Sequence, residues 1–277
     1  MSITLEVKFM INFVQKKNKH ESAGDMLRFW RKLNKVSQMD LALDAGISSK
    51  HLSFVETGRS QPSRSLILKI SDCLKLPLRQ RNAFLMAAGF ASEFKEEPFN
   101  GEKMEIVRSA LIRILEKHEP YPAMLINAAY DILMHNSGYQ KVMKALAGEE
   151  VFLKHKNVYK MVFAENGLRN YIDNWPVVEK FMLNRLLGEA AATQNQKLFD
   201  LYNDVTQLRS SDSTGLEEID PNMPVIVIRF KKDSIAASFF TTITTLGTPL
   251  DLTTQELRLE LLFPADEETR RLFSGQT

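Results

Sequence analysis

One stretch of polar side chains lies where the spacing predicts a short helix, at residues 49–57. Hydroxyl, ammonium and aromatic groups remain on its outer face: Ser48, Ser49, Lys50, Ser53 and Phe54. Such groups donate and accept hydrogen bonds at base edges, and an α-helix fits the major groove of DNA. A buried structural helix would not leave this face polar. The spacing therefore favours a helix that reads DNA bases.

Two helices packed across a tight turn would hold that face in place. The first is expected at residues 38–45, with Ser37 as N-cap and Asp40 three positions on, a capping-box arrangement. Gly46 follows and permits the positive φ of a sharp turn. The apolar residues fall where the two helices must face each other: Leu41, Ala42, Ala45, Ile47, Leu52 and Val55. This is the pattern of a helix-turn-helix unit.

Three more helices complete an all-α, five-helix domain at residues 25–90. One is marked by a three-residue spacing of its buried face: Leu27, Trp30, Leu33 and Val36. The others are expected at residues 65–75 and 78–88. Residues 1–24 end in a polar run without periodicity, which predicts a loosely ordered arm. Residues 91–101 carry acidic residues and proline, so they are interpreted as a linker.

The net charge of +2 divides unevenly along the chain. Residues 1–92 hold 15 Lys and Arg against 7 Asp and Glu, a net charge of +8. The remaining residues hold 21 against 27, a net charge of −6. A polyanion-binding domain joined to a domain without that role would show such a division. Chance and solvated faces are the plain alternative.

Residues 37–63 resemble the phage-repressor (Xre-like) helix-turn-helix family. Its pattern is close to S-Q-x-x-L-A-x-x-x-G-(V/I)-S-x-x-x-(I/L)-S-x-x-E-x-G-R-x-x-P-S, and nearly every position is met. The resemblance implies a sequence-specific transcription regulator that binds double-stranded DNA. It implies base contacts from Ser48, Ser49, Lys50, Ser53 and Phe54. Lys50 would then meet guanine O6 and N7, and Phe54 a thymine methyl.

The same resemblance implies phosphate contacts and one structural ion pair. Gln38 would bond a phosphate and brace the recognition helix, and Arg59 would contact phosphate from the loop beyond it. His51 is also expected at phosphate, since no His or Cys that could share a metal lies nearby. Arg31 and Glu56 match the positions of a family ion pair, which would fix the first helix against the third. For Lys50 and Arg59, ordinary surface charge is the alternative.

Residues 102–277 mix helical and strand patterns. Helices are expected at four places: 102–117, 137–146, 176–188 and 196–209. Strands are expected at five: 123–126, 132–135, 225–230, 235–246 and 257–263. The last three strands are rich in Val, Ile, Phe and Thr and follow closely, which predicts an antiparallel meander. We therefore expect an α+β domain with an antiparallel sheet of about five strands and helices on one face.

Residues 121–136 read as strand, polar turn, strand and helix start, as a PAS domain begins. They also resemble the MmyB-like ligand-binding domain, a PAS-related family found behind this kind of helix-turn-helix, as do residues 246–266. One departure is Leu186-Leu187, where the family more often has Leu-Arg. PAS-like folds enclose an apolar cavity, so the resemblance implies a fatty acid or other apolar small molecule as ligand. Candidate lining residues, for which ordinary core packing is the alternative, are Met124, Ile126, Met134, Met143, Phe152, Phe163, Phe181, Met182, Phe239 and Phe240.

Other function classes find little support. The sequence has no G-x-S-x-G, Walker loop, H-E-x-x-H or Cys/His cluster, so neither enzyme activity nor a metal or other cofactor is expected. Its one cysteine, Cys73, fits a reducing cytoplasm, and no apolar run is long enough for a membrane span. We expect a ligand-responsive homodimer on a palindromic operator. The alternative is an antitoxin-like adaptor whose second domain binds a protein partner.

Overall fold

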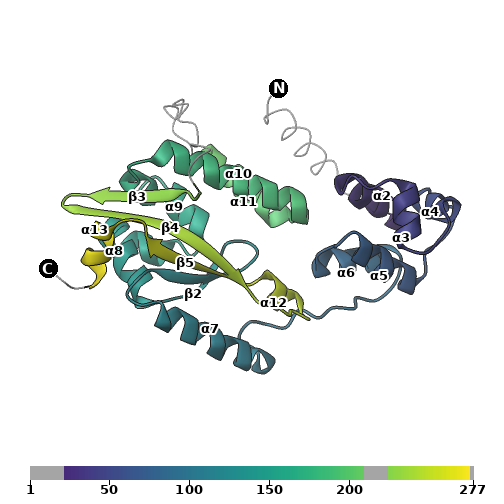
Figure 1. Ribbon diagram of the computed structural model, residues 1–277, viewed down its shortest axis with the longest axis horizontal. Helices are drawn as coiled ribbons and strands as arrows, with labels where there is room; N and C mark the ends of the chain where they lie inside the picture. The colour runs from purple at the N-terminus through teal and green to yellow at the C-terminus, as the bar shows by residue number, and fades with distance from the viewer. Residues whose placement is uncertain (1–21, 209–223, 275–277) are drawn as a thin grey trace. The chain divides into compact units, whose positions relative to one another are not determined.

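The structure, a computed structural model, describes residues 22–208 and 224–274 of the 277-residue chain. The chain divides into two compact units, with the main boundary between Glu96 and Glu97, inside the stretch expected as a linker, and with Leu250–Leu252 belonging to the first unit. Figure 1 shows helices in the first unit and a sheet with helices in the second. Most of the expected arm, residues 1–21, lies outside the described residues. Ala23 and Gly24 belong to a helix and are buried, so the first unit begins before residue 25, where the arm was expected to end.

Within residues 22–96 the first unit is all-α, as expected. Its helices are α2 (Ala23–Leu33), α3 (Gln38–Asp44), α4 (Ser49–Glu56), α5 (Arg64–Cys73) and α6 (Leu78–Ala87). The first four helices each begin behind a serine whose hydroxyl oxygen accepts the N–H three residues on: Ser22, Ser37, Ser48 and Ser63. Such a cap stabilises a helix by about 1 kcal/mol. The serine spacing therefore sets where these helices start.

The turn between α3 and α4 and the approach of α2 to α4 both depend on glycine. Gly46 has φ of +64°, as expected for the turn that leaves α3. A Cβ on Gly24 would lie 2.6 Å from the carbonyl oxygen of Val55, which is closer than atoms can approach. Helix α2 thus passes directly against the end of α4. The core beneath them is formed by buried side chains that include Leu27, Trp30, Leu41, Leu52, Ile67 and Phe84.

The second unit contains an antiparallel sheet in which the described residues form five strands. They are β1 (Ala123–Ile126), β2 (Ile132–His135), β3 (Val227–Lys232), β4 (Ile235–Thr245) and β5 (Arg258–Pro264). Their order in the sheet is β2-β1-β5-β4-β3. The predicted α+β class is correct, and β3, β4 and β5 form the predicted meander. The first strand pair joins that meander through β1 and β5, where Leu125 lies opposite Leu259.

Helices surround this sheet, and several were not predicted. Those expected are present with shifted ends: α7 (Glu105–Lys117), behind the 3-10 turn η1 (Glu102–Met104), α8 (Ser137–Lys154), α10 (Trp175–Thr193) and α11 (Gln196–Gln207). Those missed are short: α9 (Val158–Phe163), η2 (Leu168–Tyr171), α12 (Leu252–Glu256) and α13 (Glu267–Ser274). Helix α8 runs past its expected end through a break at Gly148, which has φ of +86°.

Alternate residues of the strands face opposite sides of the sheet, and both sides carry helices. Ala123, Leu125 and Leu259 pack against α7, in a cluster with Leu111 and Leu115. At intervening positions, Met124 of β1 and Glu260 and Leu262 of β5 line a cavity bounded by α8, α9 and α10. Figure 1 shows α7 and α10 on opposite sides of the sheet. The expectation of helices on one face was wrong because odd and even positions of these strands are both apolar.

Candidate functional site

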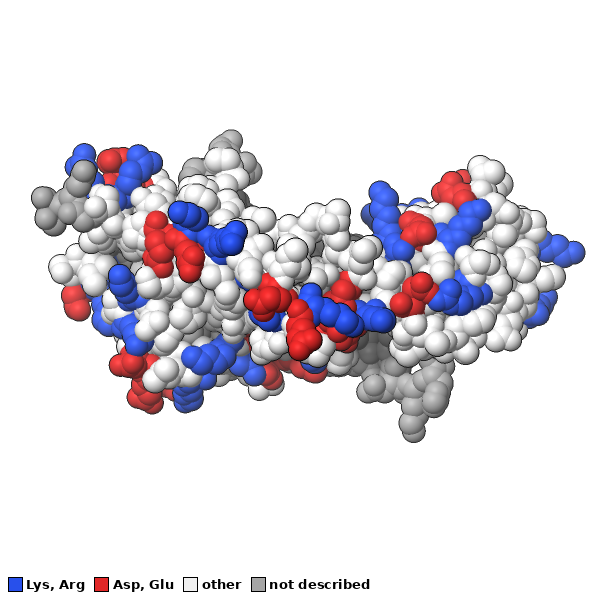
Figure 2. Space-filling model, turned by 90° about the horizontal axis from the view of Figure 1, so that it is seen from below, with Lys and Arg blue, Asp and Glu red and all other residues white. Residues whose placement is uncertain are grey.

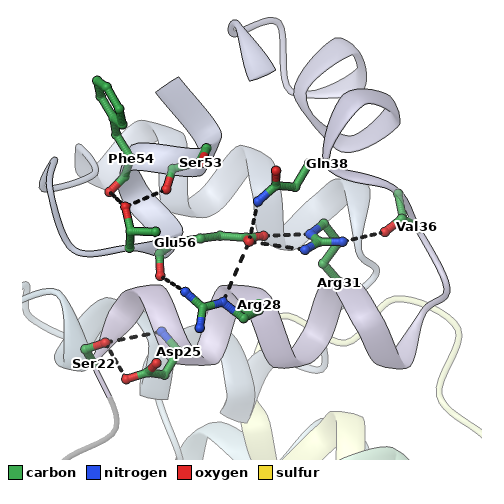
Figure 3. Close-up of polar contacts among 10 residues, drawn as sticks. Ser22, Asp25, Arg28, Arg31, Val36, Gln38, Ser53, Phe54 and Glu56 are labelled. Atoms are coloured by element: carbon green, nitrogen blue, oxygen red, sulfur yellow. Dashed lines mark hydrogen bonds and ion pairs between the residues drawn. The ribbon is translucent and has the colours of Figure 1, made fainter. Parts of the chain in front are cut away.

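The outer face of α4 is polar, and its inner face is buried. Leu52 and Val55 are buried in the core, whereas Ser49 and Lys50 are exposed. Ser53 and Phe54 are half-buried on the outer side. The ring of Phe54 points away from the polar contacts at the end of the helix (Figure 3). The predicted base-reading residues therefore lie together on and just before one short helix, where a ligand can reach them.

Two cationic side chains flank the ring of Phe54. The Nζ of Lys50 lies 5.7 Å from the ring centroid, and the guanidinium carbon of Arg59 lies 6.0 Å from it. A cation over an aromatic face at these distances is attracted to the ring. Lys50 and Arg59 are exposed, so the contact leaves both charges accessible to an anion such as a phosphate. The ring of Phe54 thus contacts both Lys50, a predicted base contact, and Arg59, a predicted phosphate contact.

Ser48 and His51 are tied to each other at the start of α4. The hydroxyl oxygen of Ser48 accepts the backbone N–H of His51 at 3.1 Å. Ser48 therefore has a capping role that its assignment as a base contact did not include. Its hydroxyl hydrogen stays available for donation. The side chain of His51 is half-buried beside the exposed Lys50.

The carboxylate of Glu56 is the centre of a buried polar network (Figure 3). Arg31 of α2 donates from Nε to Oε1 at 2.6 Å and from Nη2 to Oε2 at 3.1 Å. Arg28 donates from Nη2 to the backbone oxygen of Glu56 at 2.7 Å. The side chain of Glu56 is only 2% exposed. Burial by itself raises the pKa of Glu56, but the bonds from Arg31 and Gln38 outweigh it and the pKa is lowered.

Gln38 completes this network, a contact that the sequence analysis did not specify. Its Nε2 donates to Oε2 of Glu56 at 2.7 Å. The amide therefore braces the end of α4 from the start of α3, while its predicted phosphate contact stays a prediction. A buried carboxylate needs several donors because each unsatisfied oxygen is costly. The sequence did place Gln38 and Glu56 on two helices that were expected to pack against each other.

The second unit contains a partly open cavity of about 480 Å³ between the sheet and helices α8, α9 and α10. This volume is within the range of small-molecule sites. The lining is mostly apolar and includes Met143, Val162, Ile172, Val178, Phe181 and Ile228. An apolar cavity behind a sheet is what the PAS-like interpretation led us to expect.

The structure places some of the predicted lining residues at the cavity and others away from it. Four of the ten candidates line the cavity: Met124, Met143, Phe181 and Met182. Six do not: Ile126, Met134, Phe152, Phe163, Phe239 and Phe240. Ile126 is fully buried opposite Arg258 of β5, and the extra residue at the irregularity of the first strand pair lies in β2, at Leu133. Met134 packs with the cluster beneath α7.

The four phenylalanines that were predicted to line the cavity but do not line it pack against other rings. Three meet a partner edge-on: Phe152 on His135, Phe163 on Trp175 and Phe239 on Phe273. Phe240 stacks on Phe263, with centroids 5.6 Å apart. Aromatic pairs of this kind stabilise a core beyond their buried area. The alternative stated for these residues, ordinary core packing, therefore describes them better.

One end of the cavity is polar, which the sequence analysis missed. Arg185 of α10 donates from Nη2 to Oε1 of Glu260 on β5 at 2.7 Å. Arg258 donates from Nη1 to Oε2 of Glu189 at 2.6 Å. Both guanidinium groups lie over the ring of Tyr130, at 5.3 and 4.5 Å from its centroid. The signal was charge within apolar elements, at i,i+4 spacing in α10 and at alternate positions in β5.

The surroundings shift the pKa values of Tyr130 and Glu189 in opposite directions. Burial raises the pKa of Tyr130 to about 12, so its hydroxyl stays protonated. Burial would raise the pKa of Glu189, but Arg258 reverses the effect and the pKa is lowered. The polar end therefore brings two ion pairs, Arg185–Glu260 and Arg258–Glu189, onto the ring of Tyr130. In the ranges 22–208 and 224–274, no group of His, Cys, Asp or Glu side chains has the arrangement of a metal site.

Charge over the molecule is mixed on the face that Figure 2 shows. Lysine and arginine side chains lie beside aspartate and glutamate side chains in both units. The division of net charge along the chain does not appear there as one basic and one acidic surface. No described helix is long and apolar enough to cross a membrane.

Comparison with known families matches both units. The MmyB-like transcription regulator ligand binding domain matches residues 107–274, more than half of the chain, and a helix-turn-helix family matches residues 27–80. One similar solved structure is an RNA-binding Light-Oxygen-Voltage receptor, with 10% identity, 100% of this chain and 67% of that chain covered, and a TM-score of 0.30. At that score the similarity supports no conclusion. No curated protein sequence matches.

Proposed function

The chain belongs to the family of MmyB-like transcription regulators, and from this premise we propose that an apolar small molecule controls its binding to a specific DNA sequence. The first unit would bind DNA and the second would hold the ligand. Neither of the two families that match this chain is described as an enzyme family. The observation that carries the proposal is the pairing, in one chain, of a polar recognition helix with a separate apolar cavity.

The proposed DNA contact is made by α4 in the major groove. Ser49, Lys50 and Ser53 would read base edges, while Arg59 would hold a phosphate beside them. Base contacts select a sequence and phosphate contacts supply the salt-sensitive affinity. Support comes from the exposed outer face of α4 and from the network at Glu56, which fixes the end of that helix against α2 and α3.

The proposed ligand is a largely apolar molecule with the bulk of a fatty acyl chain. The cavity of about 480 Å³ and its methionine and aliphatic lining support this size and character. Ligand binding would shift the balance between conformations that differ in affinity for DNA. The lining includes exposed side chains such as Phe181 and Ile243, so the cavity opens at the surface, and an adaptor that binds a protein partner stays the alternative.

We further propose a cytoplasmic homodimer on a palindromic operator. Helix-turn-helix dimers place two recognition helices about 34–36 Å apart, one turn of DNA. The ligand-binding unit would then set the geometry of the pair. The expected operator is two inverted half-sites separated by about ten base pairs, centre to centre.

Selection of DNA from a random pool, with and without cellular lipid extract, tests this function. The expected result is an inverted repeat whose enrichment changes when extract is present. Enrichment of one sequence without any effect of the extract would leave DNA binding and contradict ligand control. A chain that enriches no sequence but retains a protein partner would favour the adaptor.

A further inference from the structure

The polar end of the cavity indicates which head group a ligand would have, whereas the apolar walls indicate only its chain. Among the polar groups lining it, the hydroxyl of Tyr139 donates to the sulfur of Met161 and that of Tyr159 to the backbone oxygen of Met182. Both donors are therefore already used. What remains open to a ligand is found at Tyr130, Arg185 and Glu260.

Tyr130 is the least satisfied of these groups. Its residue is 1% exposed, and its hydroxyl has no partner that meets hydrogen-bond geometry among the described residues, although the carboxylate of Glu189 lies close enough to raise its pKa. A buried hydroxyl without a partner is costly, so such groups in native proteins call for an explanation. Tyr130 lines the cavity, which means that a ligand atom can supply the missing partner.

Arg185 and Glu260 offer the complementary groups. Arg185 uses Nη2 on Glu260 and Nε on Glu189, so N–H groups of Nη1 remain. Glu260 accepts that bond at Oε1, and no other hydrogen bond to its carboxylate is found within the described residues. The polar end therefore presents donors from Tyr130 and Arg185 beside an acceptor from Glu260.

The charges at this end are already balanced. Arg258 pairs with Glu189, and Arg185 pairs with Glu260, whose side chain is only 6% exposed. A ligand carboxylate bound here would place a third anion beside the buried carboxylate of Glu260 and the half-buried carboxylate of Glu189. Like charges in a buried site disfavour the charged form, and removing a partner from a buried pair is destabilising. An uncharged head group avoids both costs.

Building on the proposed ligand-binding function, we infer that this cavity selects an amphipathic ligand with an uncharged, hydrogen-bonding head, such as a hydroxyl or primary amide, over a free carboxylate. The head oxygen accepts from Tyr130 and Arg185, and its hydrogen is donated to Glu260. The apolar chain lies along the walls formed by α9, α10 and the sheet.

The test compares decan-1-ol, decanamide and decanoate, which share one chain length, by calorimetric titration of the full chain at pH 8. The expected order has the alcohol and amide at least tenfold tighter than decanoate. Decanoate binding as tightly as the alcohol would overturn the inference while leaving the cavity as a ligand site. If none of the three binds, ligand binding by this cavity fails together with the inference.

Two variants and one control test which side chains determine the ligand preference. Glu260→Gln keeps an acceptor for Arg185 but removes the anion, so decanoate affinity should rise at least tenfold while the alcohol changes little. Tyr130→Phe should weaken the alcohol several-fold. Glu165→Gln, an exposed residue of the same unit that does not line the cavity, should leave all three affinities unchanged. An unchanged preference in Glu260→Gln would contradict the assignment.

Discussion

The guanidinium of Arg31 and the carboxylate of Glu56 form a two-point contact, with distances of 2.6 and 3.1 Å. Arg31 lies in the last turn of α2, and Glu56 is the last residue of α4. The pair therefore fixes the end of the recognition helix against the first helix. Gln38 adds a bond from α3 to the same carboxylate. The orientation of α4 depends on this buried carboxylate as much as on apolar packing.

Arg31→Met should destabilise the first unit by about 3–5 kcal/mol, because it leaves a buried carboxylate without its main partner. Urea unfolding followed by Trp30 fluorescence measures the change, in a Trp175→Phe background so that Trp30 is the single reporter. Asp44→Asn, an exposed change on α3, serves as control and should shift stability by less than about 0.5 kcal/mol. Equal effects of the two changes would contradict the role given to the network.

The lowered pKa of Glu56 predicts an acid-sensitive first unit. Because the folded-state pKa lies below the ordinary value of 4.5, the unfolded chain binds this proton more readily. The stabilisation is fully present above pH 4.5 and is lost as the pH falls through the lowered folded-state value. Urea unfolding between pH 7 and pH 3 should show this loss in the parent protein and a smaller one in Glu56→Gln. Parallel pH profiles would contradict it.

Gly24→Ala should destabilise the first unit by about 1–3 kcal/mol, since the added Cβ would overlap backbone oxygens at the end of α4. Gly188→Ala provides a matched control within α10. No atom lies within 4 Å of its Cβ position, so the change should stabilise that helix by up to about 1 kcal/mol. Thermal unfolding of both variants measures the contrast. A neutral Gly24→Ala would show that α2 and α4 are not in close contact.

Lys50 and Arg59 should differ in how they affect DNA binding. Lys50→Ala should cost about 1–3 kcal/mol on selected DNA and relax preference at one base pair. Arg59→Ala should weaken selected and random DNA alike and reduce the salt slope by about 1. Anisotropy titrations on both DNAs at several salt concentrations separate the two. A loss of equal size on both DNAs in Lys50→Ala would remove it as a base reader.

Ile228→Trp should fill part of the cavity and block ligand uptake, because Ile228 lines the cavity from β3. The parent protein should gain about 2.7 kcal/mol of stability at a ligand concentration one hundred times Kd. The variant should show no ligand-dependent rise in Tm. Ile106→Trp, on an exposed position of α7, is the control and should respond like the parent. A normal response in Ile228→Trp would place the ligand elsewhere.

The helices of the first unit could be predicted because local signals agreed with the packing. Serine caps and Gly46 determine where α3 and α4 begin and end, and the apolar spacing determines which face is buried. The predicted base-reading face of α4 is then the face that the apolar residues leave exposed. That Gln38 braces the recognition helix was expected, but Glu56 as its partner could not be predicted, because the bond depends on the distance between two helices.

The cavity was harder to predict because its lining comes from segments far apart in the chain. Aromatic residues such as Phe163 look like lining in a sequence but pack on other rings. Tyr130 has φ of +64°, a backbone conformation that its residue type does not signal. The polar end therefore emerged only from the three-dimensional arrangement.

The most direct test of ligand-controlled DNA recognition is one binding measurement. The affinity of the full chain for its selected DNA is determined with and without saturating decan-1-ol, in the parent protein and in Ile228→Trp. We predict that the ligand changes the affinity of the parent about fivefold or more, within the range of allosteric coupling, and does not change that of the variant. Equal affinities with and without bound decan-1-ol in the parent would contradict the account.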